Sequence, residues 1–190
     1  MLAEALARQG REVVLTREPG GTAGAEAIRR LLLEPPGEGW GARAEALLFA
    51  AARADHVERL IEPALERGTW VVCDRFVDSS RAYQGGAGGL GDAVIQTLHE
   101  IGSGGRRPDR TLLIDAPPET IAQRLARRDG GSSDAIGGRD SAYHAQVGAS
   151  FRALAEADRE GITIIDGHAP PDVVHERVMQ ALAPLLEDGA

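Results

Sequence analysis

Two segments of the chain place arginines and acidic side chains beside small residues, a combination suited to binding phosphorylated ligands. Residues 16–22 read TREPGGT and residues 74–85 read DRFVDSSRAYQG. A guanidinium group is a planar fork that matches phosphate oxygens, and glycine lets the backbone approach a ligand closely. A carboxylate beside an arginine can orient it or help to hold a magnesium-bound nucleotide. The candidates for these roles are Arg17, Glu18, Asp74 and Arg75; an ordinary turn and a local Asp–Arg ion pair are the alternatives.

Two helical segments also carry side chains that suit a nucleotide. Phe49 and Arg53 are four residues apart and share a helix face, where a ring could stack on a flat base and a guanidinium could bond its edge. Arg124 and Arg128 share a face of a later helix, where they could meet the phosphates or base of a nucleotide donor. The alternatives are a core role for Phe49, and for the later arginines simple exposure near the negative end of the helix dipole.

Four short apolar stretches, each ending in a polar residue, are predicted to be strands: Glu12–Thr16, Trp70–Asp74, Thr111–Asp115 and Ile162–Asp166. Their largely continuous apolar character is typical of a parallel sheet covered on both faces. Helical patterns alternate with them, which predicts an α/β protein. Ligands of such folds gather beyond the carboxyl ends of the strands, where the candidate segments begin.

Helices and loops complete this pattern within a predicted single domain spanning 1–190. Pro63 lies inside a long predicted helix and should kink or break it, because proline lacks a backbone N–H. Glycine-rich stretches at 85–91 and 102–105 predict loops, and 129–140 is predicted to be a lid loop. The predicted helices are Met1–Gln9, Ala23–Leu33, Ala42–Arg67, Gly91–Ile101, Pro118–Arg128, Ser141–Asp158 and Pro171–Leu186.

The composition excludes several classes of protein. The formal charge of −8 argues against general binding of nucleic acid. No apolar run approaches the roughly 20 residues that span a bilayer, and no signal sequence is present, so we expect a cytoplasmic protein without a membrane partner. The single Cys73 excludes an internal disulfide, and no histidine pair has zinc-site spacing, so no protein-bound metal is expected. All 21 lysine-plus-arginine residues are arginine, so the sequence contains no phosphate loop of the form G-x-x-x-x-G-K-[ST].

Four segments together resemble the thymidylate kinase family. Residues 16–22, 47–53, 74–85 and 107–109 match, in order and spacing, T-R-E-P-G-G-T, L-L-F-A-A-x-R, D-R-[YFH]-x-x-S-x-x-A-Y-Q-G and the start of R-P-D-x-T. The resemblance covers nearly the whole chain. It implies a P-loop kinase-type parallel sheet flanked by helices, and transfer of the γ-phosphoryl group of ATP, carried with Mg²⁺, to dTMP. The product would be dTDP, a precursor in dTTP biosynthesis, and the family typically forms homodimers.

The resemblance also implies a role for each matching residue. Phe49 would stack on thymine while Arg53 would bond its edge, and Arg75, with Arg17, would hold the acceptor phosphate. Asp74 would orient that arginine or the metal shell. The remaining contacts would come from Ser79, Ser80 and Gln84 to the base and from Tyr83 to the deoxyribose. Such catalysis acts by positioning and charge stabilisation, because phosphoryl transfer needs little covalent help from the protein.

Two departures from the family pattern accompany the match. The family begins with a strand and the lysine-bearing loop, so we expect this chain to lack the strand that is central in the family order 2-3-1-4-5. In the lid, the family commonly has D-R-x-E where this chain has DAIG at 134–137, and Arg139 is expected to replace the missing arginine.

Two alternative functions remain open from the sequence. The first is a non-catalytic protein that binds dTMP without turning over ATP. The second is another small-molecule kinase of the same fold, which would have no reason to keep Phe49, Arg53 and Tyr83 together.

Overall fold

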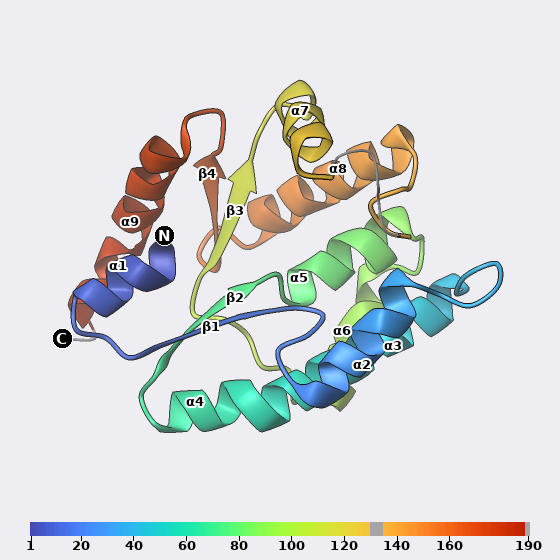
Figure 1. Cartoon of the computed structure of the whole chain (residues 1–190), viewed down its shortest axis with the longest axis horizontal. Coiled ribbons are helices and arrows are strands. Elements are labelled where there is room, and N and C mark those ends of the chain that lie inside the picture. The colour runs from blue at the N-terminus through green and yellow to red at the C-terminus, as the bar shows by residue number, and fades with distance from the viewer. Residues whose placement is uncertain (130–134, 189–190) are drawn as a thin grey trace. The chain divides into compact units, whose positions relative to one another are not determined.

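The computed structural model in Figure 1 describes residues 1–129 and 135–188 of the chain. Its contacts divide the chain into two compact units. The β1–β2 unit comprises Ala3–Arg107 and Ser133–Phe151, and the β3–β4 unit comprises Met1–Leu2, Pro108–Ser132 and Arg152–Ala190. The predicted single domain stays a prediction. Of the predicted lid, residues 130–134 lie outside the described residues.

The described strands form two parallel pairs, as the continuous apolar stretches predict. In the β1–β2 unit, β1 (Val13–Arg17) pairs with β2 (Trp70–Asp74), and the register sets Arg17 opposite Asp74. In the β3–β4 unit, β3 (Thr111–Asp115) pairs with β4 (Ile162–Asp166). Three strands have the predicted bounds, and β1 begins and ends one residue later than predicted. The expectation that the chain lacks the family's central strand stays a prediction.

The helices of the β1–β2 unit pack on one another beside the strands (Figure 1). α2 (Ala23–Leu33) packs on α3 (Ala42–His56), and α3 packs on α6 (Asp92–Ser103). The start of α2 follows from Thr22, whose side-chain oxygen accepts the N–H of Ala25 at 3.2 Å, as an N-cap residue should.

Pro63 changes the helix without ending it. A π-helical turn, η1 (Val57–Ile61), follows α3 and leads into α4 (Glu62–Glu66), so the helical path continues through the predicted kink. A π turn is one way in which a helix accommodates a local break in its hydrogen-bond ladder.

The loop predicted at 85–91 is partly wrong. α5 (Val77–Ser80) continues into a second π-helical segment, η2 (Arg81–Ala87), which takes in the first glycines. Its wide hydrogen bonds include Gly88 N–H to the Tyr83 carbonyl at 2.7 Å. A Cβ at Gly86 would lie 2.2 Å from the Ser150 Oγ, so glycine here permits close helix packing rather than a loop.

The cores of the two units are separate clusters. In the β1–β2 unit, Ala46, Val77 and Ile95 are buried together. In the β3–β4 unit, the core joins Ile165 of β4 to Val178 and Leu182, since α9 packs along β4 (Figure 1). The remaining helices are α1 (Leu2–Arg8), α7 (Pro118–Asp129), α8 (Ser141–Ala157) and α9 (Pro171–Asp188). No helix within 1–129 and 135–188 is long and apolar enough to cross a membrane.

Candidate active site

The turn after β1 is a tightly packed structure built around glycine. The Glu18 N–H donates to the Asp74 carbonyl at 2.9 Å, which ties the turn to the end of β2, and the Glu18–Pro19 peptide is cis. Gly21 has a φ of 89°, and a Cβ there would lie 2.4 Å from the Thr16 Oγ1 and 2.6 Å from the His56 Nε2. Only glycine permits this conformation and approach, so the turn lies directly against those two side chains.

Glu18 is the centre of a buried ionic cluster, although it follows a strand end where exposure would be ordinary. It is 5% exposed; its Oε2 accepts the Arg53 Nε at 2.8 Å, and its Oε1 lies 3.1 Å from the His56 Nδ1. A carboxylate only accepts hydrogen bonds, so Nδ1 carries the proton. The His56 Nε2, 2.8 Å from the Thr16 hydroxyl, can then accept from it. Both oxygens of this carboxylate thereby have a hydrogen-bond partner, as burial of a charge requires. We name Thr16, Glu18, Arg53 and His56 the Glu18 cluster.

One face of α3 carries Glu45, Phe49 and Arg53 at intervals of four residues. Arg53 extends a second branch to the Ser80 Oγ at 3.0 Å, while Glu45 accepts the Gln84 Nε2 at 2.8 Å. Along α3, Phe49 lies between these two polar contacts and is half-buried. The predicted residues Phe49, Arg53, Ser80 and Gln84 therefore belong to one pair of facing helical segments.

The end of β2 and the residue after it lie at the exposed edge of this region. Asp74 and Arg75 are both exposed, and Arg75 has a φ of 70°, which makes it the one non-glycine residue with positive φ among those described. Such a strained backbone is common where a side chain must be aimed at a ligand. The Arg75 guanidinium carbon lies 5.3 Å from the centre of the Tyr83 ring. The structure thus brings Arg75 and Tyr83 together, and Ser79 lies half-buried on α5 between their segments.

Arg17 contacts an acidic residue of α2. It is paired with Glu26 at 3.1 Å and is exposed, although the strand register sets it opposite Asp74. The backbone N–H of Gly21, and then the charges of Arg17 and Arg29, lower the pKa of Glu26 against the effect of burial. Glu26 thereby links Arg17 to the glycine turn.

Arg139, the predicted lid arginine, lies within the β1–β2 unit and contacts Glu45. It donates to the Glu45 carboxylate and to the Tyr143 hydroxyl, and its guanidinium carbon is 4.6 Å from the centre of the Tyr143 ring. Burial lowers the pKa of Arg139, but the charge of Glu45 and the hydrogen bonds to Glu45 and Tyr143 together raise that pKa above its ordinary value. Tyr143 in turn donates its hydroxyl to the Tyr83 carbonyl at 3.1 Å. We name Glu45, Gln84, Arg139 and Tyr143 the Glu45 cluster.

The predicted donor-site arginines belong to the β3–β4 unit. Arg124 donates to the carbonyls of Gly167 at 2.8 Å and Ala169 at 3.3 Å, so it ties α7 to the loop that follows β4. The side chain of Arg128 lies outside the described residues. Within 1–129 and 135–188 no three histidine, cysteine or acidic side chains gather as a metal site would require.

Sequence reasoning missed four residues of these clusters: Thr16, Glu45, His56 and Tyr143. Glu45 and His56 were detectable in part, because Glu45 precedes Phe49 by one helical turn and His56 follows Arg53 by nearly one. Tyr143 is 60 residues from its partner Tyr83, and no local pattern indicates that contact.

The fold and the site together define an α/β protein with parallel strands flanked by helices and charged residues at the strand ends. The structure is similar to that of a solved thymidylate kinase from Ehrlichia chaffeensis, with a TM-score of 0.76 and 31% identity. That match covers 96% of this chain and 87% of the other.

Sequence comparisons identify the family. A family model described as thymidylate kinase matches residues 1–178. Thymidylate kinase of Rhizorhabdus wittichii is 58% identical over 185 residues, covering 97% of this chain and 89% of that protein. Thymidylate kinase of Nitrobacter winogradskyi is 45% identical over 183 residues, covering 96% and 80% respectively. The chain therefore belongs to the thymidylate kinase family, which is a family of kinases.

Proposed function

We propose that this chain binds dTMP as acceptor and transfers to it the γ-phosphoryl group of ATP, giving dTDP. The acceptor assignment rests on one observation, the two hydrogen bonds that the Arg53 guanidinium donates to buried side chains. One branch of its guanidinium pairs with buried Glu18 and the other reaches Ser80, so the arginine is held rigidly one turn from Phe49. A preorganised guanidinium next to a ring suits a flat base with acceptor atoms on its edge.

The proposed roles of the exposed residues follow from their charge. Arg75, aimed by its strained backbone and lying over Tyr83, would hold the acceptor phosphate, and Arg17 would assist. Asp74 would orient Arg75 or the water shell of the metal. Tyr83 would pack against the deoxyribose.

ATP would enter as its magnesium complex. Magnesium bound to a nucleotide takes most of its ligands from phosphates and water, and needs only one or two protein carboxylates. The exposed carboxylate of Asp74 is a hard oxygen ligand of that kind. Arg124 and Arg128 are the proposed contacts to the donor nucleotide.

Acceptor binding and phosphoryl transfer can be tested separately. Calorimetric titration with dTMP, dUMP, dCMP and dGMP should show strongest binding of dTMP. A coupled assay for ADP, with MgATP and each acceptor, should then show turnover with dTMP. Binding without turnover would replace the proposal by the non-catalytic alternative, and equal use of all acceptors would favour another nucleotide kinase.

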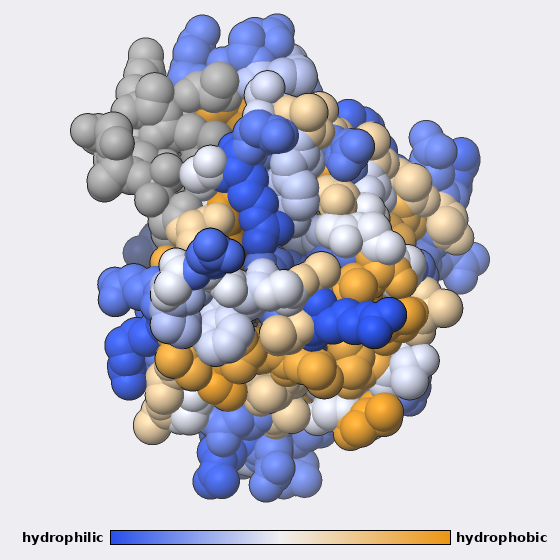
Figure 2. Space-filling view, turned by 90° about the vertical axis from the view of Figure 1, so that its right-hand side faces the viewer, coloured by the Kyte–Doolittle hydropathy of each residue, from blue (hydrophilic) through white to orange (hydrophobic). Residues whose placement is uncertain are grey.

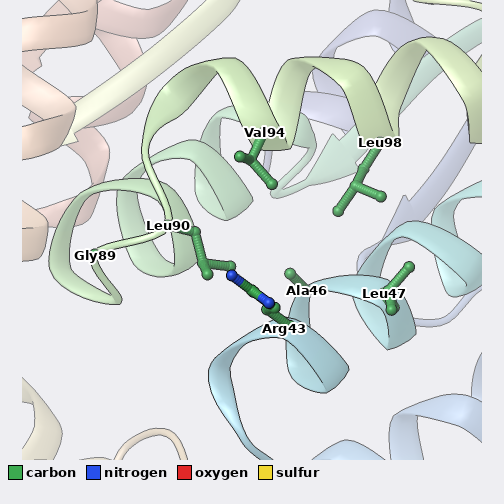
Figure 3. A pocket seen from close by; sticks show the side chains of 7 residues that line it. All are labelled: Arg43, Ala46, Leu47, Gly89, Leu90, Val94 and Leu98. Atoms are coloured by element: carbon green, nitrogen blue, oxygen red, sulfur yellow. The ribbon is translucent and has the colours of Figure 1, made fainter.

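We further propose that the protein forms a homodimer through the groove between α3 and α6. The groove is a cavity of about 310 Å³ lined by Arg43, Ala46, Leu47, Gly89, Leu90, Val94 and Leu98 (Figure 3). Leu47 and Val94 are 56% and 46% exposed. Figure 2 shows hydrophobic residues gathered on the lower part of the face that carries α2, α3 and α6 in Figure 1. Exposed apolar patches of this kind mark interaction surfaces.

Sedimentation velocity tests the dimer. Leu47→Glu should convert a dimer into a monomer, because it would bury a charge in an apolar contact. Ile121→Glu, at a similarly exposed apolar residue of α7, is the matched control and should leave the dimer intact. A wild-type chain that sediments as a monomer would refute this assignment.

A further inference from the structure

Glu45 is a buried carboxylate with no assigned role in the proposed reaction. Glu45 is 7% exposed and Gln84 is 3% exposed, so their hydrogen bond of 2.8 Å is protected from water. The second carboxylate oxygen of Glu45 accepts from Arg139. The two oxygens therefore have different partners, and the carboxylate is held in one orientation.

This arrangement fixes the orientation of the Gln84 carboxamide. A glutamine presents an NH₂ donor on one side and a carbonyl acceptor on the other, and the two ends have nearly the same shape. An ionised carboxylate only accepts hydrogen bonds, so the NH₂ end must face Glu45. The carbonyl end then points away from Glu45. Arg139 reinforces this choice, because its ion pair with the second oxygen holds the Glu45 carboxylate in place.

The orientation matters because Gln84 belongs to the same pair of facing segments as Phe49 and Arg53. We propose that Glu45 is a positioning residue that sets the base specificity of the acceptor site by presenting the Gln84 carbonyl, rather than its NH₂ group, to the base. The inference rests on the proposed binding of dTMP. Thymine carries a hydrogen on N3, which a carbonyl can accept, whereas cytosine has a bare lone pair at N3, which a carbonyl repels.

Replacing Glu45 by glutamine should remove the preference for one orientation of the Gln84 carboxamide. An amide both donates and accepts, so Gln84 could pair with the new side chain in either orientation. With its NH₂ group toward the ligand, Gln84 would pair with the cytosine N3. We expect the preference for dTMP over dCMP to fall by about tenfold, the equivalent of one hydrogen bond.

The experiment is calorimetric titration of dTMP and dCMP into wild type, Glu45→Gln, Gln84→Leu and the double variant. Glu45→Gln should lower the preference for dTMP, measured as the Kd of dCMP divided by the Kd of dTMP, by about tenfold. In the Gln84→Leu background the same change should leave the ratio unaltered, because Glu45 acts through Gln84. Glu58→Gln, at an exposed glutamate of η1, is the matched control and should behave as wild type.

Other outcomes would overturn the inference. An unchanged ratio in Glu45→Gln, or an equal change in both backgrounds, would show that Glu45 does not act through Gln84. A wild type that does not prefer dTMP over dCMP would instead refute the proposed function, and this inference with it.

A second variant covers the case in which Glu45→Gln does not fold, as judged by circular dichroism. Arg139→Met leaves Glu45 without its cation, so the ratio should fall by about two- to threefold. An unchanged ratio in folded Arg139→Met would contradict the inference.

Discussion

The β1–β2 unit contains two buried glutamates whose surroundings differ. Glu18 is enclosed by Arg53 and His56, which are 3% and 0% exposed, so its cluster is sealed from solvent. Glu45 instead pairs with Arg139, whose side chain is 28% exposed. Removing one partner of a charge sealed in this way costs much stability, because the other partner is left buried and uncompensated. A charge with a partly exposed partner can be altered at lower cost and is better placed to tune binding.

The sharpest test of this contrast is Arg53→Met. It would leave Glu18 without its guanidinium in the core, and we expect a loss of about 3–5 kcal/mol in the free energy of unfolding. Urea unfolding followed by circular dichroism measures this loss. Arg59→Met, which breaks the exposed pair between Arg59 and Asp55, is the control and should change stability little. Similar losses in the two variants would show that burial of Glu18 does not govern its energetics.

Gly21→Ala tests the packing above the Glu18 cluster. The added Cβ would strain a φ of 89° and collide with Thr16 and His56, so we expect a loss of about 2–4 kcal/mol. Gly10→Ala is the matched control, because Gly10 has a φ of 83° with no atom within 4 Å of the added Cβ. Gly10→Ala should lower the free energy of unfolding only by the backbone strain, about 1–2 kcal/mol. Equal losses of stability in Gly21→Ala and Gly10→Ala, measured by thermal or urea unfolding, would mean that the turn is not tightly packed against the Glu18 cluster.

Tyr143→Phe tests the Glu45 cluster by removing one hydroxyl. The hydroxyl donates to the Tyr83 carbonyl and accepts from Arg139, so the expected loss is about 1 kcal/mol in urea unfolding. Dimer formation and the preference for dTMP should persist, because Arg139 keeps its contact with Glu45. A loss as large as that of Arg53→Met would contradict the difference between the two clusters.

The smallest expected effect is a dependence of stability on pH that arises from His99. Burial lowers the pKa of His99, and the charges of Arg53 and Arg107 lower it further. The carbonyl of Arg106, which accepts a hydrogen bond from the ring, raises this pKa but does not cancel the decrease. Its Nδ1 is buried and has no partner among the described residues. The unfolded imidazole protonates near pH 6.5, so below that pH the unfolded chain binds more protons and stability falls as the pH drops.

His99→Gln should flatten this dependence in urea titrations between pH 7.5 and pH 5.5. His175→Gln, a substitution in α9, should retain the wild-type dependence. A wild type equally stable across this range would remove His99 as the cause.

The strands and most helices were predictable because their signals are local. Trp70–Asp74, Thr111–Asp115 and Ile162–Asp166 are continuous apolar runs, and the structure places strands at those bounds. The prediction was partly wrong at 85–91, where glycine composition indicated a loop but η2 extends to Ala87. There the glycines serve close packing of η2, which depends on Ser150 and cannot be seen from the neighbouring residues.

The sequence by itself determined the family and the candidate residues, because both depend on residue types at set spacings along the chain. Phe49, Arg53, Asp74 and Arg75 could be named without coordinates. Only the tertiary structure decided which groups these residues contact: Arg53 reaches Glu18 and Ser80, and Glu45 joins Gln84 to Arg139. Those partners are 27 to 94 residues apart. Their pairing depends on how helices and turns pack in three dimensions, which no local pattern specifies.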